Sequence, residues 1–329
     1  NIMRTIKTDI SENTLDAVKS TVSIRPNYLN EYIGQENIKK NLQTAIRAAK
    51  IKNTSLGHML FFGPPGLGKT TISAIIANEM GSRLKTVSGP AIERQGELAV
   101  ILSSLGENDI LFIDEIHRLP KAVEEILYSA MEDYKIDIIV GADQQTKTVT
   151  LDLAHFTLIG ATTRAGLISN PLRDRFHMVF NMEYYNEKEL AQIIKRTALL
   201  YGYELDDVAA SVIASVSRET PRIANNLTKR ITDYLIANEK LPKEKYIRQA
   251  LKEIGYDEKG FTSTESKYIQ CLELNKEKPT GLKTLSAYMG ESIDTIAESI
   301  EPFLIRKGYI LVTPKGRMLT SALLEDKHE

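Results

Sequence analysis

The segment that most constrains the fold is the glycine-rich stretch 63–70, Gly-Pro-Pro-Gly-Leu-Gly-Lys-Thr. It matches the pattern G-x-x-x-x-G-K-[ST] in full, follows an apolar run and precedes a helical pattern. In such a loop, backbone N–H groups and the positive end of the next helix bind phosphate oxygens. A glycine-rich turn without a ligand is the alternative, but it does not account for the flanking strand and helix. The residues predicted to bind a nucleotide here are Gly66, Gly68, Lys69, Thr70 and Thr71.

Two acidic residues, Asp114 and Glu115, follow a short apolar run downstream of this loop. We expect Asp114 and the Thr70 hydroxyl to bind Mg²⁺, and Lys69 to reach the β- and γ-phosphates. Glu115 can act as the general base that polarises the attacking water. The alternative is a solvated acidic pair that caps the next helix. His117 has no other metal-ligating residue types clustered with it, so we expect a structural or signalling role for its ring.

Short apolar runs alternate with helical patterns over the first half of the chain. The runs are bounded by Gly, Pro or Asp and lie at 59–62, 110–113 and 156–159. Helical spacing of apolar residues occurs at 35–51, 70–80, 97–105 and 122–134. This alternation predicts an α/β domain with a parallel sheet. Alternating polar and apolar residues over about 135–153 predict an inserted β-hairpin with one solvent-facing side.

The strand patterns stop after Tyr185, and the residues from 187 to 253 are helical throughout. Thr220 as N-cap and Pro221 at the first helical position give a clear helix start. This predicts a small all-α second domain, which ends in a linker-like stretch at 255–260. We therefore expect the chain to divide into domains at 1–184, 185–256 and 257–329.

The third domain has the element order of a winged helix-turn-helix. Its helical segments and its terminal hairpin are predicted at 263–274, 282–289, 292–306 and 309–319. Pro302 is expected to kink the third segment, and Gly308 is placed to end it. Lys315 and Arg317 lie at the turn of the hairpin, where they could bind DNA phosphates, or form an ordinary solvated turn.

Composition limits the classes of partner. The 329 residues carry a formal net charge of −1, so any nucleic-acid contact must come from a local basic patch. Cys271 is the single cysteine, which excludes an intrachain disulfide and fits a reducing compartment. We expect it to be buried among apolar neighbours. No apolar run approaches the roughly 18–20 residues of a membrane span, and the first residues lack a signal-peptide pattern. A cytoplasmic protein is the expectation.

Beyond these motifs, the sequence resembles the bacterial RuvB family, whose members are AAA+ motors, over nearly the whole chain. The phosphate loop and the acidic pair indicate only the AAA+ class. Further segments narrow the resemblance, and they match in order and spacing: Ile24-Arg25-Pro26, 32–35, 114–117, Gly160-Ala-Thr-Thr-Arg164, Pro171-Leu-Arg-Asp-Arg-Phe176, Thr220-Pro-Arg-Ile-Ala224 and Thr313-Pro-Lys-Gly-Arg317.

The resemblance implies roles for several further residues. Thr163 would help to place the attacking water, Arg175 would reach the γ-phosphate held by a neighbouring subunit, and Arg222 would couple the second domain to the nucleotide. The alternatives are a strand-end cap for Thr163, a surface ion pair with Asp174 for Arg175, and a plain surface arginine for Arg222. Further nucleotide-binding positions implied by the resemblance are Ile24, Arg25, Glu132, Asp133, Tyr134 and Tyr185.

The resemblance also implies partners. It implies ATP/ADP and Mg²⁺ as cofactors, a hexameric ring, four-way DNA junctions as substrate, and RuvA as a partner that docks on the 135–153 hairpin. The chain departs from the family at three places. The hairpin tip at 142–145 is polar, Val312 stands where the family has arginine, and His177 stands where the family usually has glycine.

Three functions are consistent with these observations. The first is a ring-forming ATPase that drives branch migration of four-way junctions in recombination, repair and the SOS response. The second is a clamp-loader-like AAA+ subunit, which the winged-helix tail argues against. The third is a DNA-binding regulator that uses the nucleotide only as a switch, which the intact Asp114–Glu115 pair and Arg175 argue against.

Overall fold

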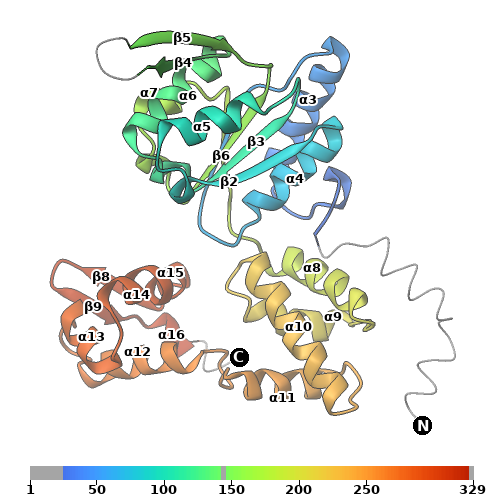
Figure 1. The fold of residues 1–329 in the computed structure, drawn as a ribbon. Coiled ribbons are helices and arrows are strands. Elements are labelled where there is room, and N and C mark those ends of the chain that lie inside the picture. Colours follow the sequence, from blue (N-terminus) through green and yellow to red (C-terminus); the bar gives the residue numbers. More distant parts are fainter. Residues whose placement is uncertain (1–24, 142–145, 326–329) are drawn as a thin grey trace, which may run out of the picture.

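The computed structural model describes residues 25–141 and 146–325 as three consecutive domains (Figure 1). The first is built on a parallel sheet of five strands in the order β2-β3-β6-β1-β7. Its strands are β1 (Met59–Phe62), β2 (Leu84–Ser88), β3 (Ile110–Asp114), β6 (Thr157–Thr162) and β7 (Met178–Asn181). Its helices are α3 (Glu36–Lys52), α4 (Lys69–Met80), α5 (Gln95–Ser103), α6 (Lys121–Asp133) and α7 (Asn170–Arg173). Short 3₁₀ turns are η1 (Leu29–Glu31), η2 (Gly89–Ala91), η3 (Ile116–Arg118) and η5 (Ala165–Leu167).

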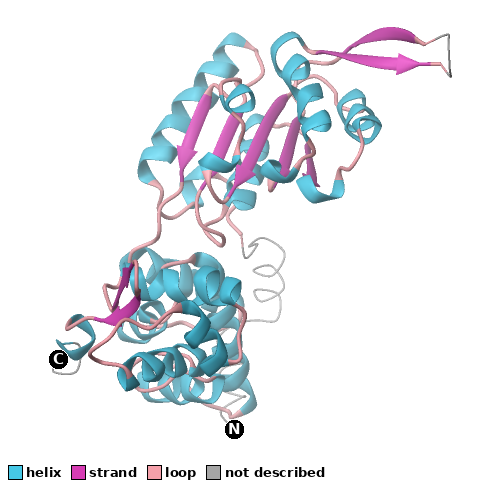
Figure 2. Ribbon diagram, turned by 90° about the vertical axis from the view of Figure 1, so that its left-hand side faces the viewer, coloured by secondary structure: helices cyan, strands magenta, loops and turns pink. Residues whose placement is uncertain are grey.

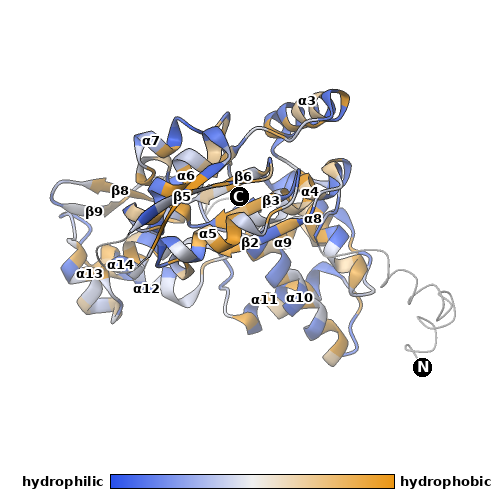
Figure 3. Cartoon of the chain, turned by 45° about the horizontal axis from the view of Figure 1, so that its top comes forward, coloured by the Kyte–Doolittle hydropathy of each residue, from blue (hydrophilic) through white to orange (hydrophobic). Residues whose placement is uncertain are grey.

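The apolar runs form strands because both faces of the sheet are covered by helices. Alternate strand residues point to opposite faces. Phe61 and Phe112 pack with α3 and α4 on one face, whereas Leu60 and Leu111 pack with α5 and α6 on the other. Figure 3 shows the strands coloured mostly hydrophobic, with mixed colours on the surrounding helices. The predicted α/β domain with a parallel sheet is confirmed.

Parallel pairing brings the carboxyl ends of β1, β3 and β6 to one edge of the sheet. Phe62 of β1 pairs with Thr162 of β6, and Ile113 of β3 pairs with Gly160 of β6. The glycine-rich loop follows β1 directly, Asp114 is the last residue of β3, and Thr163 follows β6 directly. Residues far apart in the sequence therefore meet at this edge.

The sequence patterns did not predict the edge strands β2 and β7. Both are short and lie half in solvent, as Lys85 and Val179 illustrate. A continuous apolar run marks only strands that are covered on both faces. The inserted hairpin was predicted, and its strands are β4 (Lys135–Val140) and β5 (Lys147–Asp152), which project from the domain in Figure 2. Its tip at 142–145, predicted to be polar, lies outside the described residues.

The second domain is all-helical, as predicted. Its helices are α8 (Glu187–Leu200), α9 (Asp207–Ser215), α10 (Pro221–Ala237) and α11 (Glu244–Ile254). The predicted start of α10 is confirmed, because the Thr220 hydroxyl accepts a hydrogen bond from the Ile223 amide. A second start that the sequence patterns did not single out is a capping box at Asn186, which begins α8.

The third domain is a winged helix, as predicted. Its elements are α12 (Ser263–Leu274), α13 (Leu282–Met289), α14 (Ile293–Thr295), η6 (Ile296–Ile300), α15 (Glu301–Arg306), β8 (Ile310–Thr313), β9 (Gly316–Leu319) and α16 (Ala322–Glu325). The third predicted helix runs through a π-helical turn, η6, directly before Pro302. Proline removes one helical hydrogen bond, so the wider turn at this point has a local cause. Gly308 follows the helix with φ 70°, as expected of a residue that ends it.

Cys271 is buried in the winged-helix core, as predicted. Within residues 25–141 and 146–325, the helices are all too short or too polar to cross a bilayer. The stretch 255–260 joins the second and third domains, as predicted for a linker, and it forms an ordered turn. The Asp257 carboxylate accepts hydrogen bonds from the amides of Lys259 and Phe261, each at 2.9 Å.

One buried histidine makes the stability of the first domain depend on pH. The His58 Nδ1 accepts a hydrogen bond from the Leu158 amide at 2.9 Å, and its Nε2 lies 3.0 Å from the Met131 carbonyl oxygen. Both contacts fit the neutral ring. Burial lowers the pKa of His58 to about 4. The unfolded chain binds this proton near pH 6.5, so stability is present above pH 6.5 and is lost as pH falls towards 4.

We therefore expect replacement of His58 by Gln to reduce the acid sensitivity of folding. Between pH 7.5 and 5 the wild-type ring contributes a loss of about 2 kcal/mol. Urea unfolding of both proteins at the two pH values measures this loss, and the variant should lack it. Equal pH dependence in the two proteins would show that the ring is not the source.

Candidate functional site

A cavity of about 500 Å³ lies between the carboxyl edge of the sheet and the second domain. It is lined by both domains and by the segment that precedes α3. The predicted site residues that line it are Arg25, Gly66, Gly68, Lys69, Thr70, Thr71, Asp114, Glu115, Thr163, Tyr185 and Arg222. The motifs and the family resemblance together therefore predicted a set of residues that the fold brings together.

The backbone of the glycine-rich loop adopts conformations and close contacts that a residue with a Cβ atom would disturb. Gly63 has φ 149°, and a Cβ there would lie 2.7 Å from the Met182 carbonyl oxygen. Gly68 has φ 101° and directly precedes α4, so the amide groups of the loop and the helix start open onto the cavity. Such a helix start is a site for anionic phosphate.

The Lys69 ammonium lies at the wall of this loop. It donates hydrogen bonds to the carbonyl oxygens of Gly63 at 2.7 Å and Pro64 at 2.9 Å. The pKa of Lys69 is lowered to about 8. Burial is the largest cause, the nearby Asp114 carboxylate acts in the opposite direction, and the positive charge of Arg222 adds to the lowering. Negative charge within the chain thus compensates only part of the positive charge of Lys69, and an anionic ligand would stabilise the ammonium group.

Asp114 and Glu115 stand at the end of β3 with their carboxylates at the cavity. The Glu115 backbone is left-handed at φ 49°, and its amide donates to the Asp114 Oδ1 at 2.9 Å. The backbone at Gly89 packs closely against this turn, since a Cβ on Gly89 would lie 2.3 Å from the Glu115 carbonyl oxygen. The Thr70 hydroxyl and the Asp114 carboxylate are hard oxygen ligands, which fit Mg²⁺.

The end of β6 presents two threonines in different directions. Thr163 lines the cavity, whereas the buried Thr162 hydroxyl lies 2.8 Å from His117 Nδ1. Burial of the His117 ring lowers its pKa. His117 therefore supports the strand end beside Thr163, as the expected structural role requires. Sequence patterns singled out Thr163 but gave no signal for the Thr162–His117 contact.

Two tyrosines border the cavity on the side of the segment that precedes α3. The Tyr185 hydroxyl donates to the Tyr32 hydroxyl at 2.9 Å, and both line the cavity. Burial raises the pKa of Tyr185 to about 12, so its hydroxyl stays protonated. Arg25 lines the same side, while Ile24, predicted with it, lies outside the described residues. Tyr32 was not among the predicted binding residues.

The second domain closes the cavity through the start of α10. The Arg222 amide donates a hydrogen bond to the Gly66 carbonyl oxygen at 3.2 Å, and a Cβ on Gly66 would lie 3.2 Å from the Arg222 Cβ. The Arg222 side chain is exposed and lines the cavity. The phosphate loop and the second domain are thus in direct backbone contact at this point.

Arg175 lies apart from the cavity. Its guanidinium donates to the Pro171 carbonyl oxygen at 2.7 Å and to Glu132 at 3.2 Å, and it stands 4.5 Å from the centre of the Tyr128 ring. The ion pair is with Glu132 and not with Asp174, the alternative that the sequence left open. Tyr134 stacks on His155 with 4.1 Å between ring centres.

The predicted nucleotide contacts of residues 132–134 are therefore not formed within one chain. Glu132, Asp133 and Tyr134 do not line the cavity, and Glu132 is placed beside Arg175 instead. The family resemblance on which these three positions were predicted does not distinguish a contact within the chain from one made to a neighbouring subunit.

Comparison with known proteins decides the family. Three family models match consecutive parts of the chain: the Holliday junction DNA helicase RuvB P-loop domain at 24–182, the RuvB AAA lid domain at 185–257 and the RuvB C-terminal winged helix domain at 258–325. The chain belongs to the RuvB family. As a member of that family it is an AAA+ P-loop ATPase.

Individual relatives agree with this assignment. The chain is 51% identical over 315 residues to a Kosmotoga olearia protein named Holliday junction branch migration complex subunit RuvB, covering 95% of this chain and 90% of that protein. A Helicobacter pylori protein of the same name is 51% identical over 313 residues, covering 94% and 93%. The solved Thermotoga maritima RUVB Holliday junction branch migration motor superposes with a TM-score of 0.79 at 43% identity, covering 93% of this chain and 99% of that one.

The wing of this RuvB-family chain carries the two predicted DNA-binding residues in different settings. Lys315 is exposed and forms no ion pair among the described residues. Arg317 instead pairs with the buried Glu301 at 2.7 Å and lies opposite Val312 on the hairpin. Lys315 is therefore the more available of the two for a phosphate.

We expect nucleotide binding to be coupled to protonation of Lys69. Phosphates stabilise its ammonium, so binding raises its pKa from about 8 and takes up a proton. Calorimetric titration with ATP in two buffers of different ionisation enthalpy at pH 8 should report an uptake of about half a proton, and affinity should fall as pH rises above 8.

The matched control for this experiment is Lys69→Arg, whose guanidinium keeps its charge at all these pH values. It should show no uptake attributable to this position. The same proton uptake in the wild type and in Lys69→Arg would contradict the assignment of the shift to Lys69.

Proposed function

We propose that the chain is the motor subunit that couples ATP hydrolysis to branch migration of four-way DNA junctions. The observation that carries the proposal is the cavity, in which a phosphate loop and two carboxylates face a second, separately folded domain. The family relatives are named for Holliday junction branch migration. The winged-helix domain supplies the surface for DNA.

The cavity residues fit ATP and Mg²⁺. Lys69 and the loop amides would hold the phosphates, and Thr70 and Asp114 would hold the metal. Mg²⁺ bound there would neutralise charge on the phosphate oxygens. Glu115, on a turn fixed by Gly89, is placed to orient and deprotonate a water, and Thr163 would help to position that water.

A second subunit would complete the site. Arg175 and Glu132 lie outside the cavity of their own chain, so the proposed contact of Arg175 with the γ-phosphate requires a neighbour. A fixed positive charge there stabilises the transition state of phosphoryl transfer. A subunit that gives Arg175 to one neighbour and takes it from another forms a head-to-tail contact, which yields a closed ring when the rotation between subunits closes. A hexamer around DNA is the proposed assembly.

The projecting hairpin supports the proposed docking of RuvA. Val140, Val149 and Leu151 are exposed on the same face of the hairpin as the buried Ile136. This apolar face continues outwards from the domain core. Exposed apolar surface of this kind is a mark of a protein–protein contact.

The proposed DNA contact is with the backbone. Helix residues before the wing include Asp294, Glu298 and Glu301 but no basic residue until Arg306, which does not favour major-groove contact. Lys315 on each subunit would neutralise phosphates without regard to sequence, with Arg317 held next to it. Val312 adds no charge at its position.

The proposal also includes the domain boundaries and the role of the protein in the cell. The family models meet at 182–185 and at 257–258, which supports a division at 1–184, 185–256 and 257–329. The proposed setting is the cytoplasm, in recombination, repair and the SOS response. A clamp-loader-like ATPase and a nucleotide-switched regulator remain the alternative functions, and no described feature favours either.

Dissociation of a labelled four-way junction with ATP and Mg²⁺, with and without purified RuvA, tests the proposal. We expect conversion into two duplexes, faster with RuvA. Lys69→Ala should abolish both nucleotide binding and conversion, since it removes the main phosphate contact.

Arg175→Ala separates binding from turnover. It should bind nucleotide normally and lower ATP hydrolysis by about 10³-fold or more. ATP hydrolysis by the wild type without junction movement under any condition would reject the branch-migration function in favour of the clamp-loader-like alternative.

A further inference from the structure

All three domains meet at one short loop, residues 217–220, which joins α9 to α10. Arg218 and Glu219 both have left-handed backbones, at φ 52° and 62°. Two such residues in succession are unfavourable without glycine, so the surrounding contacts must hold them. Those contacts come from the winged-helix domain and from the connection between the first two domains.

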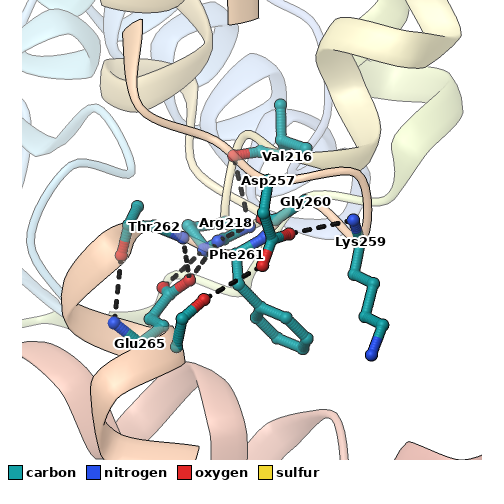
Figure 4. Close-up of polar contacts among 9 residues, drawn as sticks. Val216, Arg218, Asp257, Lys259, Gly260, Phe261, Thr262 and Glu265 are labelled. Atoms are coloured by element: carbon teal, nitrogen blue, oxygen red, sulfur yellow. Dashed lines mark hydrogen bonds and ion pairs between the residues drawn. The ribbon is translucent and has the colours of Figure 1, made fainter. Parts of the chain in front are cut away.

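Arg218 fastens the loop to the winged-helix domain (Figure 4). Its guanidinium forms a two-pronged contact with Glu265 of α12, with Nε 2.9 Å from Oε1. It also donates to the Gly260 carbonyl oxygen at 2.7 Å, and it lies 4.1 Å from the centre of the Phe303 ring. Both side chains of the ion pair are about nine-tenths buried. The second and third domains are thereby joined by a fixed contact.

Arg306, at the end of α15, reaches the same loop from the other side. Its Nε donates to Glu219 at 2.8 Å, and its Nη1 donates to the Tyr184 hydroxyl at 2.8 Å. Its guanidinium also lies 3.6 Å from the centre of the Tyr184 ring. Lys307, its neighbour, stands 3.9 Å from Glu219. Arg306 therefore points towards the other two domains.

The two residues that Arg306 contacts lead directly into the nucleotide cavity. Tyr184 precedes Tyr185, and Glu219 stands two positions before Pro221, and both Tyr185 and Pro221 line the cavity. The Tyr185 amide donates to the Glu219 carbonyl oxygen at 3.0 Å, which ties the two segments together. One side chain of the DNA-binding domain thus holds both segments that form the cavity wall.

From this arrangement we infer that Arg306 is a positioning residue that couples the nucleotide cavity to the DNA-binding domain. A change in the angle of Tyr185 or of the α10 start on nucleotide binding moves Tyr184 and Glu219, and the winged-helix domain follows through Arg306. The Arg218–Glu265 contact makes the second and third domains turn as one body. The inference rests on the proposed function, because it assigns a route between ATP and DNA.

The chemistry of the contact requires arginine. The planar guanidinium offers several donors in fixed directions, so it can bind a carboxylate and a phenol hydroxyl together while it stacks on the phenol ring. A lysine could keep the charge opposite Glu219 but not the stacking and the second hydrogen bond. Arg306→Lys is therefore expected to keep only part of the coupling.

The test measures how much nucleotide changes DNA affinity. Fluorescence anisotropy gives the Kd for labelled duplex DNA with and without a non-hydrolysable ATP analogue and Mg²⁺, and the ratio of the two Kd values is the coupling. Coupling of this kind is typically about 5- to 150-fold. We expect Arg306→Gln to bring the ratio close to one, while the Kd of the analogue without DNA changes by less than about twofold.

Arg248→Gln is the matched control. It removes an exposed ion pair with Glu244 in the second domain, away from the loop, and should keep the wild-type ratio. Thermal unfolding of each variant shows whether the fold is retained. A wild-type ratio in Arg306→Gln would overturn the inference. So would a loss of coupling that is accompanied by an equal loss of analogue affinity and a lower Tm, because that pattern indicates a merely structural role.

The wild type separates this inference from the proposed function. If the wild type binds no DNA, or binds it with the same Kd with and without the analogue, the motor proposal fails and the inference falls with it. If the wild type is coupled and Arg306→Gln is equally coupled, only the inference fails.

Discussion

The structure depends on one backbone contact between two domains, the hydrogen bond from the Arg222 amide to the Gly66 carbonyl oxygen. The start of the phosphate loop is tied to the sheet of the first domain, because the Gly63 amide donates a hydrogen bond to the Thr162 carbonyl oxygen of β6 at 3.2 Å. The second domain therefore meets a fixed surface at this point. Since a Cβ on Gly66 would lie only 3.2 Å from the Arg222 Cβ, the two segments approach closely and leave little room for a side chain at position 66. A nucleotide in the cavity would lie against both sides of this junction, since Gly66 and Arg222 both line it.

This junction explains how one site could both hydrolyse ATP and move the second domain. The groups proposed to carry out hydrolysis belong to the first domain and stand at or just after the ends of buried strands, which favours a rigid site. Arg222 and Tyr185, which are proposed to contact the nucleotide, belong to the segments that carry the second domain. The contacts of Arg218 and Arg306 extend those segments to the winged helix. The cavity thus lies between the proposed catalytic residues of the first domain and the two domains that are proposed to move.

Sequence patterns predicted what depends on local order. The strands that carry the loop and Asp114 are continuous apolar runs, and the proposed catalytic groups lie at or just after the strand ends, so their meeting at one sheet edge was predictable. The short edge strands β2 and β7 were not, because half-exposed strands lack such runs. The Tyr32–Tyr185, Thr162–His117 and Arg218–Glu265 contacts were also missed. Their partners stand 153, 45 and 47 residues apart, and no local pattern marks such pairs.

The most direct test of the account is a distance measurement across the junction. Spin labels would be placed at exposed Ile51 of α3 and Leu241 after α10, with the buried Cys271 replaced by Ser. Double electron–electron resonance would then compare the ATP-analogue and ADP states. The account predicts different distances in the two states, and loss of that difference in Arg222→Ala. One unchanged distance in both states would contradict the claim that the nucleotide sets the position of the second domain.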